Sequence, residues 1–263
     1  MRMRFCQVGL LVCSLSCQSV PPAHIADEQT EAARLWHEGQ VRLQQGHAKQ
    51  ALERFEESLA LDPELHRNHL SMAAASLEKG DEIGACIHLG CYVDEHPEHW
   101  VVRGQYAELL LRLHRVQAAR DQFELFGAKA QEAGEEAIPQ LVHCHSRLTR
   151  IARTQHDYFG EHLHRGIGLY YLACERAKLP DANGELPVEA LLFQAAGELA
   201  LARTLKPNEA RPSWFLYQAW TTLSVRHAAL QSLRRAYEDA PFSFLTQHEF
   251  NSLQLAWMRE MRR

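Results

Sequence analysis

Histidine is the residue type in this 263-residue sequence that could most readily carry out chemistry, since the sequence contains 16 histidines. Imidazole nitrogens bind zinc and related ions. Five histidines fall between residues 143 and 164: His143, His145, His156, His162 and His164. Two pairs among them are separated by two residues, which turns the rings roughly 200° apart on a helix. We therefore predict hydrogen-bonded or solvated histidines and no metal ligands; convergence between helices, and with it a metal-binding role, remains the alternative.

Catalytic patterns are absent from the sequence. There is no G-x-S-x-G, no H-E-x-x-H, no glycine-rich phosphate loop and no C-x-x-C pair. Asp181–Gly184 reads as a turn between helices, because it lacks the spacing of a calcium loop. The sequence predicts a non-enzymatic protein with no catalytic residues and no cofactor.

Four cysteines lie beyond the N-terminal segment: Cys86, Cys91, Cys144 and Cys174. Cys86 and Cys91 are five residues apart, roughly 7.5 Å along a helix axis, which is too far for a disulfide. We expect free thiols that act as small buried residues.

Four kinds of position recur with a 34-residue period in the first half of the chain. They are Ala51, Ala85 and Ala119; Phe55, Leu89 and Phe123; Gly46 and Gly80; and Pro63 and Pro97. The small residues allow two helices to approach, and the larger ones four residues later lie on the same face. The glycines can end one helix and the prolines stop the next. The pattern predicts stacked helical hairpins.

A second block with the same period lies near the C-terminus. Ala195, Leu199, Ala202 and Pro207 recur one period later as Ala229, Leu233, Ala236 and Pro241. Ala195 lies eight positions beyond two full periods from Ala119, so the second block is out of step with the first. Helical runs at 138–154, 157–178 and 187–206 give an odd number of helices before a helix that starts near Ser213. We expect the pairing of helices to slip in this region.

The segment Leu35–Pro63 resembles a tetratricopeptide repeat, through Gly39, Ala51, Phe55 and Pro63. The resemblance implies an all-α fold, an α-solenoid of antiparallel helical hairpins in a right-handed superhelix. We expect about twelve helices, with an irregular middle module and a C-terminal capping helix. The predicted segments are a signal peptide (1–17), a tether (18–30), three repeats (31–133), an irregular module (134–190), further repeat-like helices (191–243) and the capping helix (244–263).

The N-terminus has the pattern of an export signal. Arg2 and Arg4 precede an apolar run, Phe5–Leu15, which is short for a membrane span. Ser16-Cys17 resembles the end of a bacterial lipobox, although Ser14 stands where leucine is usual. We predict a lipoprotein lipidated at Cys17 and anchored in the outer membrane facing the periplasm; a plain secretory signal or an uncleaved anchor is the alternative.

The resemblance also implies where a partner binds, because the first helices of such hairpins line a concave groove. Trp36, Leu70, Gly104 and Trp214 take equivalent groove-facing positions, with core packing as the alternative for both tryptophans. Gln40, Ala74 and Glu108 occupy the position where a carboxylate-clamp repeat carries asparagine, so we do not expect that clamp.

Two glycines interrupt an apolar helix in the irregular module. Gly166 and Gly168 each cost roughly 1 kcal/mol relative to alanine there. We favour close helix packing for both, with Tyr171 packed as well. The alternative is a specialised contact surface with His162, His164, Tyr170 and Tyr171 exposed.

The net charge of −5, with acidic and basic residues interspersed, argues against nucleic acid as a partner. Together these features predict a protein-interaction scaffold or assembly factor in the bacterial cell envelope. Its partner would be an envelope protein of unknown identity that binds through a peptide or helix on the concave surface. A histidine-rich metal-binding protein and a self-associating structural protein are the alternatives.

Overall fold

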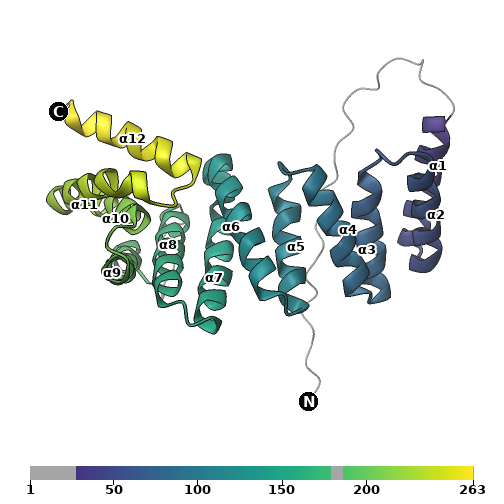
Figure 1. Cartoon of the computed structure of the whole chain (residues 1–263), viewed down its shortest axis with the longest axis horizontal. Coiled ribbons are helices and arrows are strands. Elements are labelled where there is room, and N and C mark those ends of the chain that lie inside the picture. Colours follow the sequence, from purple (N-terminus) through teal and green to yellow (C-terminus); the bar gives the residue numbers. More distant parts are fainter. Residues whose placement is uncertain (1–27, 179–185, 263) are drawn as a thin grey trace.

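The computed structural model describes residues 28–178 and 186–262 and contains only helices in those ranges. Twelve α-helices and two short 3-10 helices follow one another in an elongated arc (Figure 1). They are α1 Glu28–Gln44, α2 Ala48–Leu61, α3 Arg67–Lys79, α4 Glu82–Glu95, α5 Trp100–Arg112, α6 Val116–Ala133, η1 Gly134–Ala137, α7 Ile138–Thr154, α8 Tyr158–Arg176, α9 Val188–Leu205, α10 Ala210–Thr222, α11 Arg226–Asp239, η2 Ala240–Phe242 and α12 Gln247–Met261. The predicted all-α solenoid of helical hairpins is confirmed.

The first six helices form three hairpins whose seams are made by the residues of the 34-residue register. Ala51, Ala85 and Ala119 have no exposed surface, and Phe55, Leu89 and Phe123 are buried beside them. Gly39 shows how close the helices come, since a Cβ atom there would lie 2.4 Å from the Phe55 ring. The small and large positions therefore act as a pair that fixes the distance between the two helices.

Left-handed residues end the first helix of each hairpin. They are Gly46, Gly80, His114, His156 and Ser224, with φ between 56° and 83°. The first three follow the period of the register, but His156 comes eight positions later than that period requires. The additional positions lengthen two helices, because α6 and α7 have 18 and 17 residues where α4 and α5 have 14 and 13. This lengthening moves the fourth hairpin out of the register.

The fourth hairpin, α7/α8, is followed by the single helix α9 before the hairpin α10/α11. Helix α9 runs antiparallel to α8, because Lys206 lies over the Phe159 ring at one end and Leu191 packs with Ala173 at the other. Gly166 lets these helices touch: a Cβ atom there would lie 2.6 Å from Leu199 Cγ. Helix α10 starts at Ala210, earlier than the predicted start near Ser213, because Pro212 fits the first turn of a helix without losing a hydrogen bond.

Helix α12 differs in one respect from the predicted cap. Leu253 and Ala256 pack into the core formed by α10 and α11, as a capping helix would. Its first turn, however, reaches back to α6 (Figure 1). There Gln131 donates a 2.9 Å hydrogen bond to Glu249. Thr246 and Glu249 form a capping box that starts the helix at this point. The helix therefore ties the end of the chain to its middle.

The predicted signal, the tether up to residue 27 and the turn Asp181–Gly184 lie outside the described residues. None of the described helices has the length and apolar character needed to span a membrane. The four cysteines Cys86, Cys91, Cys144 and Cys174 are free thiols; Cys91 is exposed and Cys174 half-buried, so the expectation of burial fails for these two.

Candidate functional site: the inner helices and a buried polar network

The predicted groove positions of the first hairpin lie half-buried between α1 and α3. Trp36 donates a 2.9 Å hydrogen bond from Nε1 to Ser71 Oγ, and Gln40 donates to the same oxygen at 2.7 Å. The Arg67 guanidinium lies 4.2 Å from the centre of the Trp36 ring, in a cation–π contact. Trp36 and Gln40 thus combine partial exposure with fixed orientation.

The equivalent positions of the second and third hairpins continue this strip. Leu70 and Ala74 of α3 are half-buried. Glu108 of α5 accepts hydrogen bonds from His143 Nε2 at 2.8 Å and from Arg147 Nε at 2.7 Å, both on α7. Burial works against ionisation of Glu108, but these two partners outweigh it and lower the pKa of the carboxyl group. Glu108 therefore joins the third hairpin to the fourth.

Two of the predicted groove residues have other roles. A Cβ atom on Gly104 would lie 3.1 Å from the Phe126 ring, so this glycine serves the contact between α5 and α6. Trp214 is 6% exposed and belongs to the C-terminal core, so its predicted place in an open groove is wrong. The reason is that helices α8, α9, α11 and α12 all contribute buried residues to the cluster that contains Trp214. Residues 210–216 of α10 are all buried, as expected for a helix covered on every side.

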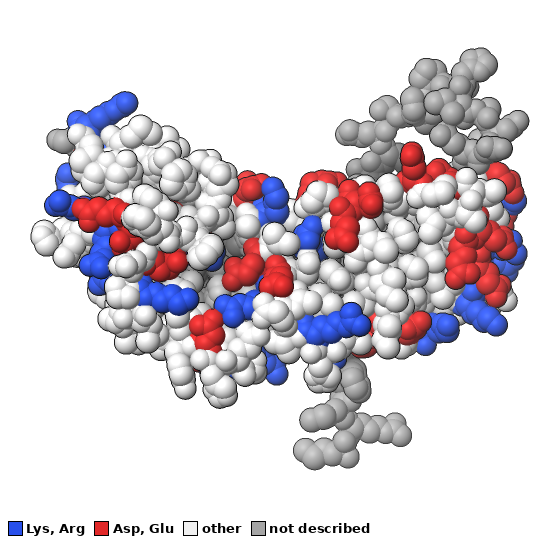
Figure 2. Space-filling view, viewed as in Figure 1, with Lys and Arg blue, Asp and Glu red and all other residues white. Residues whose placement is uncertain are grey.

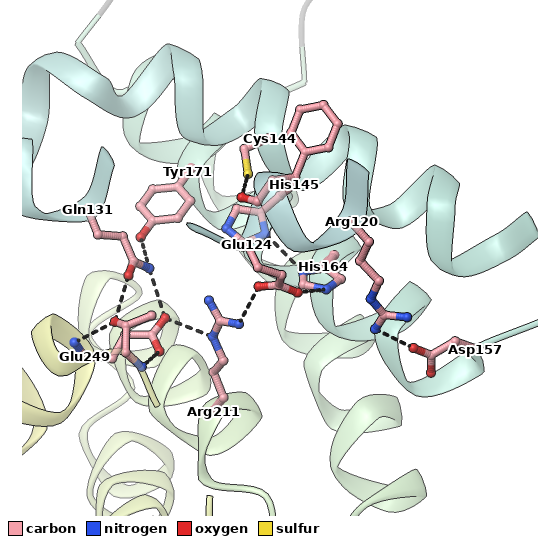
Figure 3. Close-up of polar contacts among 12 residues, drawn as sticks. Arg120, Glu124, Gln131, Cys144, His145, Asp157, His164, Tyr171, Arg211 and Glu249 are labelled. Atoms are coloured by element: carbon pink, nitrogen blue, oxygen red, sulfur yellow. Dashed lines mark hydrogen bonds and ion pairs between the residues drawn. The ribbon is translucent and has the colours of Figure 1, made fainter. Parts of the chain in front are cut away.

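A buried polar network links α6, α10 and α12 (Figure 3). Arg211 donates from Nε to Glu249 Oε1 at 2.9 Å, and its Nη1 lies 3.6 Å from Glu124 Oε2. Gln131 donates to the same Glu249 oxygen and lies 3.1 Å from the Tyr171 hydroxyl. Glu249 is 1% exposed, so its charge is compensated by Arg211 and by the capping box.

The network continues through two histidines to α7 and α8. His164 Nε2 lies 3.2 Å from Glu124, while His164 Nδ1 lies 3.2 Å from His145 Nδ1. The two nitrogens of His164 point to opposite sides of its ring, so the three groups form a chain and cannot enclose one ion (Figure 3). Of the other histidines in this module, His143 pairs with Glu108 and His162 with Glu198, at 2.6 Å. Nothing here brings three of them together as ligands.

The pKa shifts in the network follow from burial and charge. Burial lowers the pKa of His145 well below its usual value, and His164 and Arg211 lower it further. Burial opposes the charge of Glu124, but His164 and Arg211 outweigh it and hold the pKa of this carboxyl group far below its usual range. Burial likewise opposes the charge of Arg211, but Glu249 and Glu124 raise its pKa. The result is one buried cation between two carboxylates, with a neutral His145.

The irregular module packs its central residues closely, as predicted for Gly168 and Tyr171. His164 is 2% exposed, and Tyr171 stacks on His145 with ring centres 5.8 Å apart. A Cβ atom on Gly168 would lie 3.3 Å from His145 Cβ, so this glycine lets α8 approach α7. The alternative of an exposed contact surface is therefore wrong for His164. Tyr170 and Tyr171 instead line a cleft of about 490 Å³ together with Cys174, Gln218 and His248.

Sequence reasoning missed the network because its members are scattered. Gln131 and Glu249 are 118 residues apart, and no periodicity joins them. The signal that was available is local: Thr246-x-x-Glu249 before an apolar run is a capping box, which marks the start of α12. It identifies the helix but not its contact with α6.

Comparison with known proteins gives distant likenesses of shape. No family model matches the chain, and no curated protein matches it. Among solved structures, the Podosopora anserina putative kinesin light chain with nearly identical TPR-like repeats is 16% identical, with 82% of this chain and 97% of that chain covered and a TM-score of 0.44. MamA 41-end from Desulfovibrio magneticus RS-1 is 15% identical, with 83% and 98% covered and a TM-score of 0.37.

The structure described as Pseudomonas aeruginosa pilF is 13% identical, with 87% of this chain and 99% of that chain covered and a TM-score of 0.38. The assignment of the fold does not depend on any of these. The 34-residue register, the buried alanine and phenylalanine seams and the left-handed helix ends together make this chain a tetratricopeptide-like solenoid.

Proposed function

We propose that this protein is a non-enzymatic interaction scaffold of the bacterial cell envelope that binds a segment of another protein on its N-terminal hairpins. The observation that carries the proposal is the strip of half-buried residues on α1, α3 and α5: Trp36, Gln40, Leu70, Ala74 and Glu108. They recur at the register interval on the first helices of three successive hairpins. In the C-terminal half, Trp214 at the corresponding position is buried in the core, so the proposed surface covers the first three hairpins.

The chemistry of this strip suits an extended peptide or an amphipathic helix. Trp36, Leu70 and Ala74 offer apolar contact, while Gln40 supplies an amide beside them that its hydrogen bond to the buried Ser71 holds in place. A peptide that lays apolar side chains on the strip would gain hydrophobic contact with a largely preformed surface. The face seen in Figure 2 carries acidic and basic side chains intermixed, which favours a protein partner over nucleic acid.

The absence of enzymatic activity is part of the proposal and rests on how the titratable groups are used. Cys144 is fully buried, its Sγ lies 3.2 Å from the Phe123 carbonyl oxygen, and burial raises its thiol pKa. It is therefore a poor nucleophile. The half-buried carboxylate of Glu124 and the buried carboxylate of Glu249 are both paired with Arg211, which lies between them. These three groups, the thiol and the two carboxylates, therefore serve the fold, and none of them is available as a nucleophile or base for a substrate.

The test is mild cross-linking in native envelopes followed by affinity recovery and mass spectrometry of the attached proteins. Ala74→Glu places a charge in the middle of the strip, and Ala118→Glu places the same charge at an exposed position of α6. We expect a reproducible envelope protein with the wild type and with Ala118→Glu, and its loss with Ala74→Glu. Recovery of the bait alone or with itself would contradict the proposal and favour self-association.

Export and lipid anchoring at Cys17 form the second part of the proposal, supported by the charged and apolar pattern before that residue. The expected mature protein begins at a diacylated Cys17 and sediments with outer membranes. Metabolic labelling with a fatty acid, compared between the wild type and Cys17→Ser, checks this. Equal labelling of both proteins would exclude Cys17 as the anchor.

A further inference from the structure

The turn between α4 and α5 brings together three side chains with metal-binding atoms. It has the sequence His96-Pro97-Glu98-His99. His96 Nδ1 lies 3.1 Å from Glu98 Oε1, and His99 Nε2 lies 3.6 Å from the same oxygen. One ligand atom from each residue lies within 4.8 Å of the other two, and no other group of three in the described part of the chain does so.

The surrounding helices hold this turn in place. His96 ends α4 and His99 precedes α5, with Pro97 fixing the backbone between them. Tyr92, which is 6% exposed, places its hydroxyl 2.6 Å from His99 Nδ1. In the tautomer that donates Nδ1–H to that hydroxyl, His99 presents the Nε2 lone pair to Glu98, as a hydrogen-bonded ligand histidine does. The His66 ring packs edge-on against His96, 5.6 Å between centres.

We infer that this turn binds a divalent ion of the zinc class through His96 Nδ1, His99 Nε2 and the Glu98 carboxylate. In tetrahedral zinc coordination with bonds of 2.0–2.1 Å, neighbouring ligand atoms are about 3.3 Å apart. The distances of 3.1 and 3.6 Å lie on either side of that value. Two imidazoles and one carboxylate favour zinc, copper or nickel over magnesium and calcium, which prefer oxygen ligands.

Binding requires one rearrangement, which is itself measurable. The His96 and His99 rings are stacked with 16° between their planes and 5.0 Å between their centres. Nitrogen lone pairs lie in the ring plane, so nearly parallel rings do not point at one ion. The His99 side chain is 47% exposed and can turn about its hydrogen bond to Tyr92, so the ion breaks the stack. Three protein ligands then leave a fourth position open to water or to a side chain of another molecule.

The site is a property of this chain and not of the repeat. One period earlier, the same turn carries Asp62, Pro63, Glu64 and Leu65, without either histidine. There Asp62 accepts a hydrogen bond from the Glu64 backbone N–H, an ordinary turn contact. The site is also distinct from His145 and His164, which are buried and arranged in a chain.

The test uses the full chain without an affinity tag, stripped with a chelator and titrated calorimetrically with ZnCl₂, with MgCl₂ as the ion control. We expect saturable 1:1 zinc binding. His96→Ala and His99→Ala each weaken it at least ten-fold, whereas His227→Ala, an exposed histidine of α11, leaves it unchanged. Failure of the wild type to bind zinc, or unchanged binding by the His96→Ala/His99→Ala double variant, would overturn the inference.

A measurement on the wild type keeps the inference testable if a variant folds poorly. Long-range ¹H–¹⁵N correlation spectra of the imidazoles report which ring nitrogen carries the metal. We expect zinc to shift Nδ1 of one histidine and Nε2 of another, assigned to His96 and His99. Zinc shifts confined to other histidines would contradict the site.

Discussion

The hairpins α3/α4 and α7/α8 share a pattern of five identical residues at one constant spacing: His69 and His145, Asp81 and Asp157, Gly84 and Gly160, His88 and His164, Gly90 and Gly166. Both aspartates cap the second helix by accepting from the glycine N–H, at 2.8 and 2.9 Å. In both hairpins the two histidines face each other through Nδ1, at 3.4 Å in the first and 3.2 Å in the second. The ring planes are tilted by 30° in each pair.

The two hairpins differ in what surrounds them. His69 and His88 are half-buried on an open row of hairpins. His145 and His164 are 1% and 2% exposed, because α6, α9 and α10 pack against the second hairpin. Enclosure brings a cost, since buried polar groups need partners. In the second pair, His164 contacts Glu124, and Glu124 in turn pairs with Arg211, which also pairs with Glu249. The comparison teaches that one hairpin pattern serves an open surface in one place and a closed core in the other.

The largest loss of stability is expected from removing the positive charge of Arg211, which compensates the buried carboxylate of Glu249 in the closed region. Arg211→Ala leaves Glu249 buried and unpaired, and removing one partner of a buried ion pair costs about 3–5 kcal/mol. We expect the C-terminal half to unfold at lower urea concentration than the N-terminal hairpins. Tryptophan fluorescence measures unfolding of each region separately. One set of variants keeps only the C-terminal tryptophans Trp214, Trp220 and Trp257, and the other keeps only the N-terminal tryptophans.

Two controls define that result. Arg112→Ala breaks an exposed pair with Glu82 in the open region and should cost less than about 1 kcal/mol. Arg211→Met combined with Glu249→Leu replaces both charges by apolar groups and should recover most of the loss, as such replacements often do. If Arg211→Ala costs no more than Arg112→Ala, the network does not hold the C-terminal half together.

A smaller change in stability is expected when alanine replaces Gly90 of α4 or Gly166 of α8, which occupy matched positions in the two hairpins. A Cβ atom on Gly166 would lie 2.6 Å from Leu199 Cγ and 3.2 Å from the Ala195 carbonyl oxygen, in the contact of α8 with α9. Gly166→Ala should therefore destabilise the protein by roughly 1–3 kcal/mol through overpacking. At Gly90 the nearest atom is the Tyr106 hydroxyl, 3.2 Å away, which a small ring movement can relieve.

Gly90→Ala is thus expected to be neutral or stabilising, by up to about 1 kcal/mol, since alanine favours the helix. Gly197→Ala, where nothing lies within 4 Å, serves as the reference for the helix propensity alone. Thermal unfolding of the three variants checks the order. Equal effects at Gly90 and Gly166 would mean that the contact with α9 does not constrain α8.

The sequence predicted what depends on local repetition. The register identifies the seams at Ala51, Phe55 and their equivalents, and the spacing of Ala119 and Ala195 correctly indicates a slip of eight positions. Those inferences hold because hairpin contacts are short in sequence. The eight additional residues lie in the longer helices α6 and α7, and no sequence pattern shows where they are inserted.

Contacts between distant segments could not be predicted in this way. Trp214 occupies a groove position by register, but residues from α8, α9, α11 and α12 join it in one buried cluster. Glu249 reads as a capping residue, and nothing in the sequence says that its carboxylate also meets Arg211 and Gln131. The match between the two histidine hairpins was present as a constant spacing, but a search at the period of the repeats does not find it.

The finest distinction between the two regions is their dependence on pH. Burial lowers the pKa of His145 well below 6.5, and that of His69 and His88 is also lowered by burial. An unfolded histidine takes up a proton near pH 6.5 while the folded one stays neutral, so the unfolded state binds more protons below that pH. Stability is then fully present above about pH 6.5 and falls as the pH drops, by at most about 1.4 kcal/mol per unit for one buried histidine.

The groups that face His145 set the size of this effect. His164 and Arg211 disfavour its protonation, whereas Glu124 favours it. His145→Asn keeps a donor near Nδ1 without a titrating group and should flatten the pH dependence of urea unfolding between pH 5 and 7. His69→Asn should change the slope less, because the first pair is half-buried and partly solvated. If the two variants flatten the profile equally, enclosure does not distinguish the hairpins energetically, and the shared pattern alone determines how they titrate.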